Sequence, residues 1–250
     1  MNELARQFID LPVEFSTDKD PLTRAAGIMP HTYLGIYSLF FEVYREQDIN
    51  VCEIGVLEGD SVVLWNKYFQ NAHIYGFDLF GRVNMQSVET KIGSNVDHDR
   101  LTLVRGNSTK KVHTKEIPEC HVIIDDGNHE REVQTDTYNV FRDKLHKDGI
   151  YIIEDVGWTN NRSFDPKELG DDLGFHTIDM RYNDMEITDE LKKYLQWPYR
   201  YGGDNALLVY YDKDSKYADK FDSIIESEVW KTDREFSGEY VLEEFLKNSR

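Results

Sequence analysis

The sequence predicts an α/β fold with a Rossmann-like, mostly parallel sheet, helices on both faces and an antiparallel last strand. Short apolar runs typical of buried strands alternate with longer segments of helical periodicity, which is the pattern of a parallel α/β sheet. A glycine turn at Gly55 follows the first apolar run directly, and several later runs end in acidic residues. Because such sheets bind ligands at the carboxyl ends of their strands, these polar ends are the candidate functional positions.

The elements follow in order from their local patterns. Residues 50–54 are apolar and stop at Gly55, which predicts a strand, and 61–69 carry apolar residues at helical spacing. A helix at 130–145 is expected to stop near Gly149 and lead into the next strand. The other expected elements are a helix at 31–46, strands at 74–78, 101–107, 122–126 and 150–155, and an antiparallel pair at 175–181 and 205–211.

A chain of 250 residues is long enough for one large α/β domain, and we expect a single domain over 1–250. Two polar stretches, 81–100 and 157–172, are too long for plain connections. We expect them to be loops over the carboxyl edge of the sheet and candidate substrate lids. The expected parts of the domain are an N-terminal extension (1–30), the core (31–212) and an amphipathic helical tail (213–250).

The composition limits the partners. With 47 Asp and Glu against 29 Lys and Arg, the formal net charge is -18, which argues against nucleic acid and a membrane surface as partners. Cys52 and Cys120 accompany apolar runs, so we expect small core residues rather than a disulfide or a metal pair. The N-terminal residues contain no apolar signal core, and no apolar run approaches membrane-spanning length, which predicts a cytoplasmic protein. A homo-oligomeric state is left open.

The first glycine loop suits a particular cofactor. Residues 51–59 read Val-Cys-Glu-Ile-Gly-Val-Leu-Glu-Gly, and Gly55 permits a sharp turn and a close ligand approach. Gly59 and Ser61 open a helix whose first-turn amides are free to face a ligand. Asp78 ends the second strand, where an acid can accept two ribose hydroxyl hydrogen bonds. The arrangement suits the aminoacyl and ribose parts of S-adenosylmethionine and predicts a methyltransferase.

A dinucleotide cofactor is the alternative, because its sites also combine a glycine turn with an acid roughly 20 residues on. Those sites prefer G-x-G-x-x-G, whereas here Glu53 precedes Gly55 and only Gly59 follows. A carboxylate would repel a pyrophosphate but attract the ammonium group of a bound methionine moiety. The stretch therefore favours S-adenosylmethionine over a nicotinamide cofactor. A glycine turn without a ligand is the plainest alternative.

Acidic residues also end the fourth and fifth expected strands: Asp125 and Asp126, then Glu154 and Asp155. Adjacent parallel strands lie about 4.8 Å apart, so these carboxylates can converge and would repel one another without a cation between them. Oxygen ligands in that number suit Mg²⁺, with His129 near enough to remove a proton from a coordinated sugar hydroxyl. The competing interpretation is that Asp125 or Asp126 caps the following helix and the other pair is a solvated strand end.

The acceptor is expected over the metal and under the two long loops, near Tyr33, Trp158 and the aromatic segment 197–201. Aromatic faces pack against sugar rings; equally, Trp197 and its neighbours could simply pin the loop before the last strand. If the acceptor carries a diphosphate, the candidate cations are Arg24, Arg162, Arg181 and Arg200.

The motifs at 53–65, 74–78, 124–129 and 149–155 resemble, in order and spacing, those of the class I metal-dependent sugar O-methyltransferases typified by mycinamicin VI 2''-O-methyltransferase. The same outline occurs in cephalosporin hydroxylase-like proteins. The resemblance covers roughly 31–160 and implies a class I methyltransferase sheet. It also implies a small-molecule acceptor, which we expect to be a sugar that is free, nucleotide-linked or part of a polysaccharide precursor.

By this resemblance Asp126, Glu154 and Asp155 would hold Mg²⁺, and His129 would be the catalytic base. The residues that it implies at S-adenosylmethionine are Glu53, Gly55, Ser61 and Asp78, with Asn107, Ser108 and Asp125 on the nucleoside side. The sequence departs from the family pattern at Asp60, where a second glycine is usual, at Asn128, where serine is usual, and at Asn107, where aspartate is common.

The resulting prediction is a Mg²⁺-dependent O-methyltransferase that acts on a sugar hydroxyl. Three alternatives stay open. A metal-independent enzyme would methylate another small hydroxylated molecule, and its carboxylates would be caps. A non-catalytic module would bind the cofactor without turnover, and an NAD-dependent sugar-modifying enzyme would be stabilised by a different cofactor.

Overall fold

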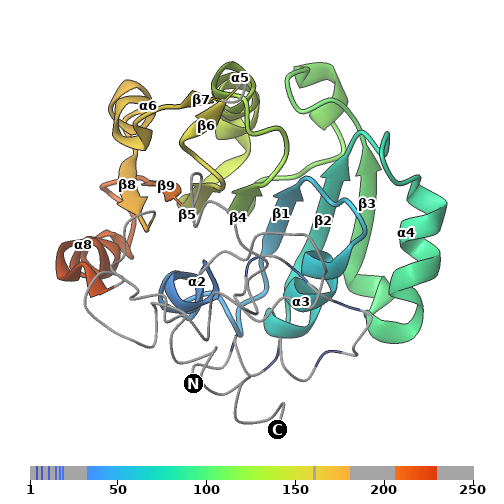
Figure 1. Cartoon of the computed structure of the whole chain (residues 1–250). Helices are drawn as coiled ribbons and strands as arrows, with labels where there is room; N and C mark the ends of the chain where they lie inside the picture. The colour runs from blue at the N-terminus through green and yellow to red at the C-terminus, as the bar shows by residue number, and fades with distance from the viewer. Residues whose placement is uncertain are drawn as a thin grey trace, which may run out of the picture.

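The computed structural model describes residues 33–159, 162–180 and 206–229, together with six residues before them: Leu4, Gln7, Leu11, Phe15, Thr17 and Lys19. Its centre is a seven-stranded sheet in the order β3-β2-β1-β4-β5-β9-β8 (Figure 1). The strands are β1 (Asn50–Ile54), β2 (His73–Asp78), β3 (Leu101–Arg105), β4 (Cys120–Asp125), β5 (Leu145–Ile153), β8 (His176–Asp179) and β9 (Ala206–Tyr211).

The sheet is parallel from β3 to β5, and β9 runs antiparallel to both β5 and β8. This confirms the expected Rossmann-like sheet with an antiparallel end. The strands β1, β4 and β9 are almost wholly buried, as is β5 from Asp148 onward, which a parallel sheet covered on both faces requires.

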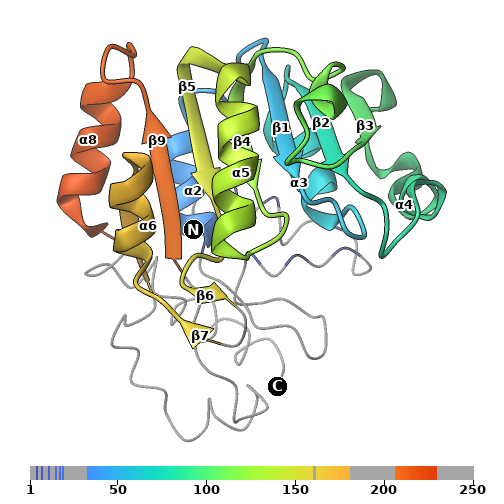
Figure 2. The same cartoon turned by 90° about the horizontal axis from the view of Figure 1, so that it is seen from above.

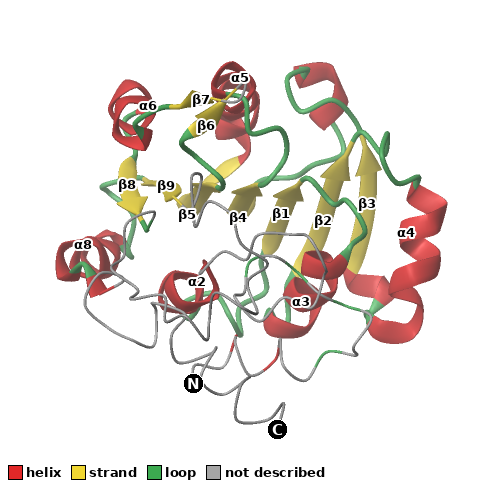
Figure 3. Ribbon diagram, in the orientation of Figure 1, coloured by secondary structure: helices red, strands yellow, loops and turns green. Residues whose placement is uncertain are grey.

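Helices cover both faces of the sheet. Their bounds are α2 (Tyr33–Phe41), α3 (Asp60–Tyr68), α4 (Met85–Ile92), α5 (Arg131–Phe141), α6 (Pro166–Leu173) and α8 (Ala218–Ser227). Figures 1 and 2 show α2, α3 and α8 on one face and α5 and α6 on the other, with α4 beside the β3 edge. A two-stranded hairpin of β6 (Trp158–Thr159) and β7 (Arg162–Ser163) lies near α5 (Figure 3).

Both expected loops contain a helix, α4 in the first and α6 in the second, so the prediction of loops alone over these stretches is wrong. In the first loop the Asn84 side chain accepts a hydrogen bond from the Ser87 amide at 3.0 Å and begins α4. In the second, Asp165 accepts from the Lys167 amide at 3.0 Å, and Pro166 opens α6. Both are ordinary N-cap contacts, and they indicate a helix even though the surrounding residues are polar.

The strand β5 begins five residues earlier than the sequence indicates. The expected helix ends at Phe141, a 3-10 turn covers Arg142–Lys144, and β5 starts at Leu145. Gly149 is inside the strand, where a Cβ atom would lie 2.8 Å from the His121 carbonyl oxygen. Close pairing with β4, and not a turn, therefore explains this glycine.

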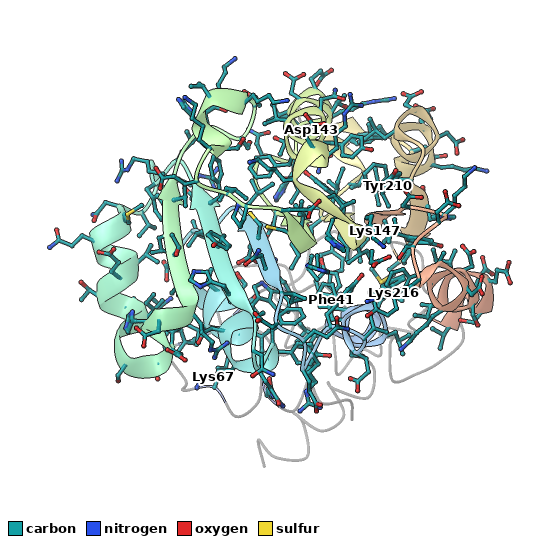
Figure 4. All side chains as sticks on the ribbon, turned by 180° about the vertical axis from the view of Figure 1, so that it is seen from behind. Phe41, Lys67, Asp143, Lys147, Tyr210 and Lys216 are labelled. Atoms are coloured by element: carbon teal, nitrogen blue, oxygen red, sulfur yellow. The ribbon has the colours of Figure 1, made fainter. Side chains whose placement is uncertain are left out.

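The core on the α2 face is aromatic. Phe41 stacks on Tyr37 with 4.8 Å between ring centroids and meets the edge of Trp65 at 5.8 Å. Figure 4 shows Phe41 among the packed side chains and Lys67 at the periphery. The expected tail helix is present as α8, and its Phe221 is fully buried against Phe40.

Cys52 and Cys120 are free and buried, which confirms them as core residues. Within the described ranges, no helix combines the length and the apolar character that a membrane span requires. Trp230, expected in the tail helix, lies outside the described residues.

Candidate active site

The carboxyl ends of the central strands bring the predicted site residues to one edge of the sheet. The parallel ladders continue beyond the strand ends: the Gly55 amide donates to the Phe77 carbonyl at 2.8 Å, and the Asp126 amide donates to the Ile54 carbonyl at 2.8 Å. The Glu154 amide donates to the Asp125 carbonyl at 2.9 Å. The glycine loop and the acidic strand ends are therefore neighbours in space.

Gly55 is required by the approach of another backbone. Its φ is +94°, and a Cβ atom there would lie 1.9 Å from the Asp126 carbonyl oxygen and 3.0 Å from Gly127 Cα. The sequence suggested that a ligand would approach this glycine, but the atoms facing its missing side chain belong to the loop after β4. Gly59, at φ +90°, precedes α3, and its missing side chain faces Val88 and Ile92 of α4.

Asp78 organises the glycine loop. Its Oδ2 accepts hydrogen bonds from the amides of Val56 at 2.8 Å and Leu57 at 3.4 Å, and its Oδ1 accepts from the Phe80 amide. The side chain is half-buried, so it keeps an accessible side. Leu57 and Phe80 have positive φ values of 47° and 51° without being glycine, and strained backbone of this kind clusters at ligand sites.

Glu53 is fully buried beneath the glycine loop. Ser61 donates to its Oε2 at 2.8 Å and Trp65 Nε1 donates to its Oε1 at 3.0 Å, so Glu53 fastens helix α3 to strand β1. Burial raises the pKa of Glu53 to about 7, although the Lys19 ammonium and the two donors oppose that shift. Both oxygens are thus engaged inside the protein.

The residues expected near the nucleoside are also held locally. Asn107 Oδ1 accepts from the amide and hydroxyl of Thr109, each at 2.9 Å, and Ser108 shares a hydrogen bond with Thr137 at 2.8 Å. Asp125 is buried, and burial raises its pKa to about 7. Its Oδ1 accepts from the Gly127 amide at 3.4 Å, while Glu130, and neither aspartate, is the N-cap residue of α5.

Asp126, His129 and Asp155 form a group whose candidate metal-ligand atoms lie within 4.8 Å of one another. His129 Nε2 lies 3.3 Å from Asp126 Oδ1, and His129 Nδ1 lies 3.4 Å from Asp155 Oδ2. Asp155 has a positive φ of 55°, which turns its side chain at the end of β5. The two carboxylates supply oxygen donors that fit a divalent ion with open positions, and the imidazole beside them is placed to accept a proton.

Glu154 faces a different set of partners. Tyr37 donates to its Oε1 at 2.7 Å, and the Lys19 ammonium donates to its Oε2 at 2.8 Å. Burial and the nearby carboxylates of Asp126 and Asp155 raise the pKa of Glu154, against the effect of Lys19. Lys19 contacts both Glu154 and Asp126, so it joins these two neighbouring acids.

Lys19 was not among the residues that the sequence indicated. Its Nζ lies 2.5 Å from Asp126 Oδ2, and its side chain is 1% exposed. For Asp126, burial alone would raise the pKa, but Lys19 and His129 together hold it below its usual range. A single lysine without a surrounding periodic pattern carries no sequence signal for such a position.

Tyr33 and Tyr37, one turn apart on α2, hold the two acids after β5. The Tyr33 hydroxyl donates to Asp155 Oδ1 at 2.7 Å and accepts from the Asp155 amide at 3.3 Å. Both tyrosines are fully buried. Tyr33 therefore holds Asp155 and does not present its ring face to an acceptor, although the sequence had suggested that it would. The spacing of four residues between Tyr33 and Tyr37 was the sequence feature that could have indicated their shared role.

Other residues expected at the acceptor cannot be placed. The segment 197–201, Arg24, Arg181 and Arg200 lie outside the described residues, as do the side chains of Trp158 and Arg162.

The structure thus defines an α/β domain whose glycine loop and acidic strand ends meet at the carboxyl edge of a mostly parallel sheet. Residues 52–156 match the family model of a methyltransferase domain, which confirms the resemblance indicated by the motifs. Among curated proteins, the chain is 26% identical over 140 residues to a tetracenomycin rhamnosyl 3'-O-methyltransferase of Streptomyces olivaceus. It is 26% identical over 140 residues to mycinamicin VI 2''-O-methyltransferase of Micromonospora griseorubida.

Each alignment covers 52% of this chain, and the chain spans about a third of the length of these relatives, 33% and 32%. Among solved structures, the MycE methyltransferase of the mycinamycin pathway, in complex with Mg and SAH, gives a TM-score of 0.48 at 23% identity. That superposition covers 68% of this chain and 40% of MycE.

Proposed function

We propose that the protein is an S-adenosylmethionine-dependent O-methyltransferase that acts on a sugar hydroxyl with the help of a divalent ion, most simply Mg²⁺. The observation that carries the proposal is the placement of two groups on one edge of the sheet: the glycine loop with Asp78, and the Asp126–His129–Asp155 group. The glycine loop with Asp78 suits the methyl donor, and the Asp126–His129–Asp155 group suits the acceptor hydroxyl. The curated relative from Streptomyces olivaceus is named for a rhamnosyl-bearing substrate, which supports a sugar as acceptor.

The chemistry divides between the two halves of the site. Asp78 would bind the ribose diol of the cofactor through its accessible side, while its other contacts keep the glycine loop in place. His129 would take the proton of the acceptor hydroxyl while the hydroxyl oxygen receives the methyl group from the sulfonium of the cofactor. A divalent ion held by Asp126 and Asp155 would lower the pKa of that hydroxyl.

Glu154 enters this proposal as the third predicted ligand of the ion, and Asp125, Asn107 and Ser108 as the nucleoside side of the cofactor site. We propose that Glu53, Gly55, Gly59 and Ser61 act on the cofactor through the loop and helix that they shape. The Glu53 and Ser61 side chains bond to each other, and a side chain added at either glycine would meet other parts of the protein. For the acceptor we propose a nucleotide-linked or polysaccharide-precursor sugar.

A metal-independent O-methyltransferase is the second candidate function. The Lys19 ammonium between Asp126 and Glu154 favours it, because this ammonium already supplies a positive charge to the acids. In that case His129 would act without help from an ion.

The deciding experiment measures methyl transfer from S-adenosylmethionine to a panel of free and nucleotide-linked sugars, after chelation and after Mg²⁺ is restored. We expect transfer to a sugar hydroxyl that disappears with the chelator, and an Asp155→Asn variant that is inactive but still binds cofactor. The exposed Asp99→Asn variant is the control. Full turnover of the chelated enzyme would select the metal-independent candidate, and cofactor binding without transfer to any acceptor would favour a binding module.

A further inference from the structure

Lys19 lies among three acids, Glu53, Asp126 and Glu154, and Asp155 follows Glu154 directly. Its Nζ lies 2.5 Å from Asp126 Oδ2 and 2.8 Å from Glu154 Oε2, with Glu53 Oε1 at 3.8 Å. A buried ammonium is retained only where carboxylates compensate its lost hydration, and here two of them do so directly. Lys19 is therefore an internal counter-ion of these acids.

The backbone of Lys19 is held independently of its side chain. Its carbonyl accepts from the amides of Tyr33 at 3.1 Å and Leu34 at 3.3 Å, at the start of α2. Its amide donates to Thr17 Oγ1 at 3.4 Å. Helix α2 also supplies the tyrosines that hold Glu154 and Asp155. The backbone of Lys19 and the two acids are therefore all held by the same helix. The side chain of Lys19 can leave the acids without loss of these backbone contacts.

A divalent ion and this ammonium cannot share the same two oxygens. Mg²⁺ binds carboxylate oxygens at about 2.0–2.1 Å. An ion that bridged Asp126 Oδ2 and Glu154 Oε2 would need the space that Nζ fills. The oxygens nearest His129 are different ones, Asp126 Oδ1 and Asp155 Oδ2. Even there, an ion would meet the repulsion of a buried positive charge that contacts the same aspartate.

We propose that Lys19 is an intramolecular competitor of the divalent ion: its ammonium and the ion exclude each other at Asp126 and Glu154, so ion binding displaces the Lys19 side chain. This inference rests on the metal site in the proposed function. It gives Lys19 the role of a residue that sets metal affinity and couples metal binding to exposure of its own side chain.

Calorimetric titration of chelator-treated protein with Mg²⁺ tests the competition. Lys19→Met keeps an unbranched apolar stem without the charge, and we expect it to bind Mg²⁺ about tenfold or more tightly than the unaltered protein, as loss of a charge-assisted contact implies. Lys111→Met is the matched control, because Lys111 is 72% exposed and pairs with Asp143. Its affinity should equal that of the unaltered protein. Equal affinity of the Lys19→Met and unaltered proteins would overturn the inference and leave the proposed function intact.

A second measurement needs no variant. An amine-reactive reagent followed by mass spectrometry should label Lys19 slowly in metal-free protein and several-fold faster with saturating Mg²⁺, while the labelling of Lys111 stays constant. Labelling of Lys19 that does not respond to bound Mg²⁺ would contradict the displacement. If no form of the protein bound Mg²⁺, the metal site of the proposed function would fail and this inference with it.

Discussion

Gly55 and Asp126 are in backbone contact across the carboxyl edge of the sheet: a Cβ atom on Gly55 would lie 1.9 Å from the Asp126 carbonyl oxygen. The amide of Asp126 is held in turn by the carbonyl of Ile54, at 2.8 Å. The loop proposed for the methyl donor and the acid proposed for the ion are thus fixed to each other by main-chain atoms. A change at one is expected to move the other.

The Gly55→Ala variant tests this contact. Alanine would have to adopt φ +94° and push the Asp126 backbone away, so we expect a loss of about 2–4 kcal/mol in the free energy of unfolding. Gly174→Ala is the matched control, because Gly174 has φ +72° but nothing within 4 Å of the added atom. Urea denaturation measures both. Equal losses would mean that backbone strain alone, without the Asp126 contact, explains this glycine.

Asp78→Ala should weaken S-adenosylmethionine binding by more than tenfold. The variant loses charge-assisted hydrogen bonds worth about 1.5–3 kcal/mol and also frees the amides of Val56 and Leu57, which loosens the loop. Titration calorimetry gives the affinity, and the surface variant Asp143→Ala should bind as the unaltered protein does. An unchanged affinity of Asp78→Ala would contradict the assignment of this acid to the ribose.

His129→Ala should lower turnover by about 10²–10⁴-fold while cofactor affinity barely changes, because a positioned base contributes in that range to proton transfer. The ring lies between Asp126 and Asp155, where it can reach a hydroxyl bound near either acid. Rates should be compared at saturating metal and cofactor, with the exposed His98→Ala variant as control. Retention of more than about a tenth of the activity would demote His129 to an orienting residue.

Tyr37→Phe removes the donor to Glu154 Oε1, and the buried carboxylate keeps its Lys19 contact alone. We expect a loss of about 1–3 kcal/mol in the free energy of unfolding, the usual cost of a buried acceptor left without its partner. Tyr75→Phe provides the control at a half-buried tyrosine of β2, and its change should stay within about 0.5 kcal/mol. Comparable small effects in both variants would show that the Tyr37 hydroxyl does not hold Glu154.

The raised pKa of Glu53, about 7 against an ordinary 4.5, makes stability depend on pH. The native state binds this proton more tightly than the unfolded chain, so the contribution is complete below about pH 4.5 and is lost as the pH rises through 7. Glu53→Gln lacks this titration. Between pH 4.5 and 8, its free energy of unfolding should therefore gain on the order of 3 kcal/mol relative to the unaltered protein. Urea denaturation in the presence of a chelator measures it, and the exposed Glu116→Gln variant should follow the unaltered protein at both pH values.

The sequence by itself determined which strands and helices follow one another along the chain, and it placed acids at the carboxyl edge of the sheet. Apolar runs bounded by glycine and acids specify β1, β2 and β4, because the period of the side chains and the turn residues act within a few positions of one another. Parallel strands then carry Asp78, Asp126 and Asp155 to the same edge, so the existence of the candidate site was predictable. The start of β5 was not, since pairing with β4 overrode the local turn signal at Gly149.

Only the tertiary structure decided how the site residues are partnered. Lys19 reaches Asp126 across 107 positions of sequence, and Tyr37 reaches Glu154 across 117. Neither contact leaves a periodic trace in the sequence, because each depends on where α2 packs against the sheet. The packing of α3 against β1 decides in the same way that Ser61 donates to Glu53. The local pattern places acids at the edge of the sheet, and the long-range packing decides which of them face an ion, a lysine or a tyrosine.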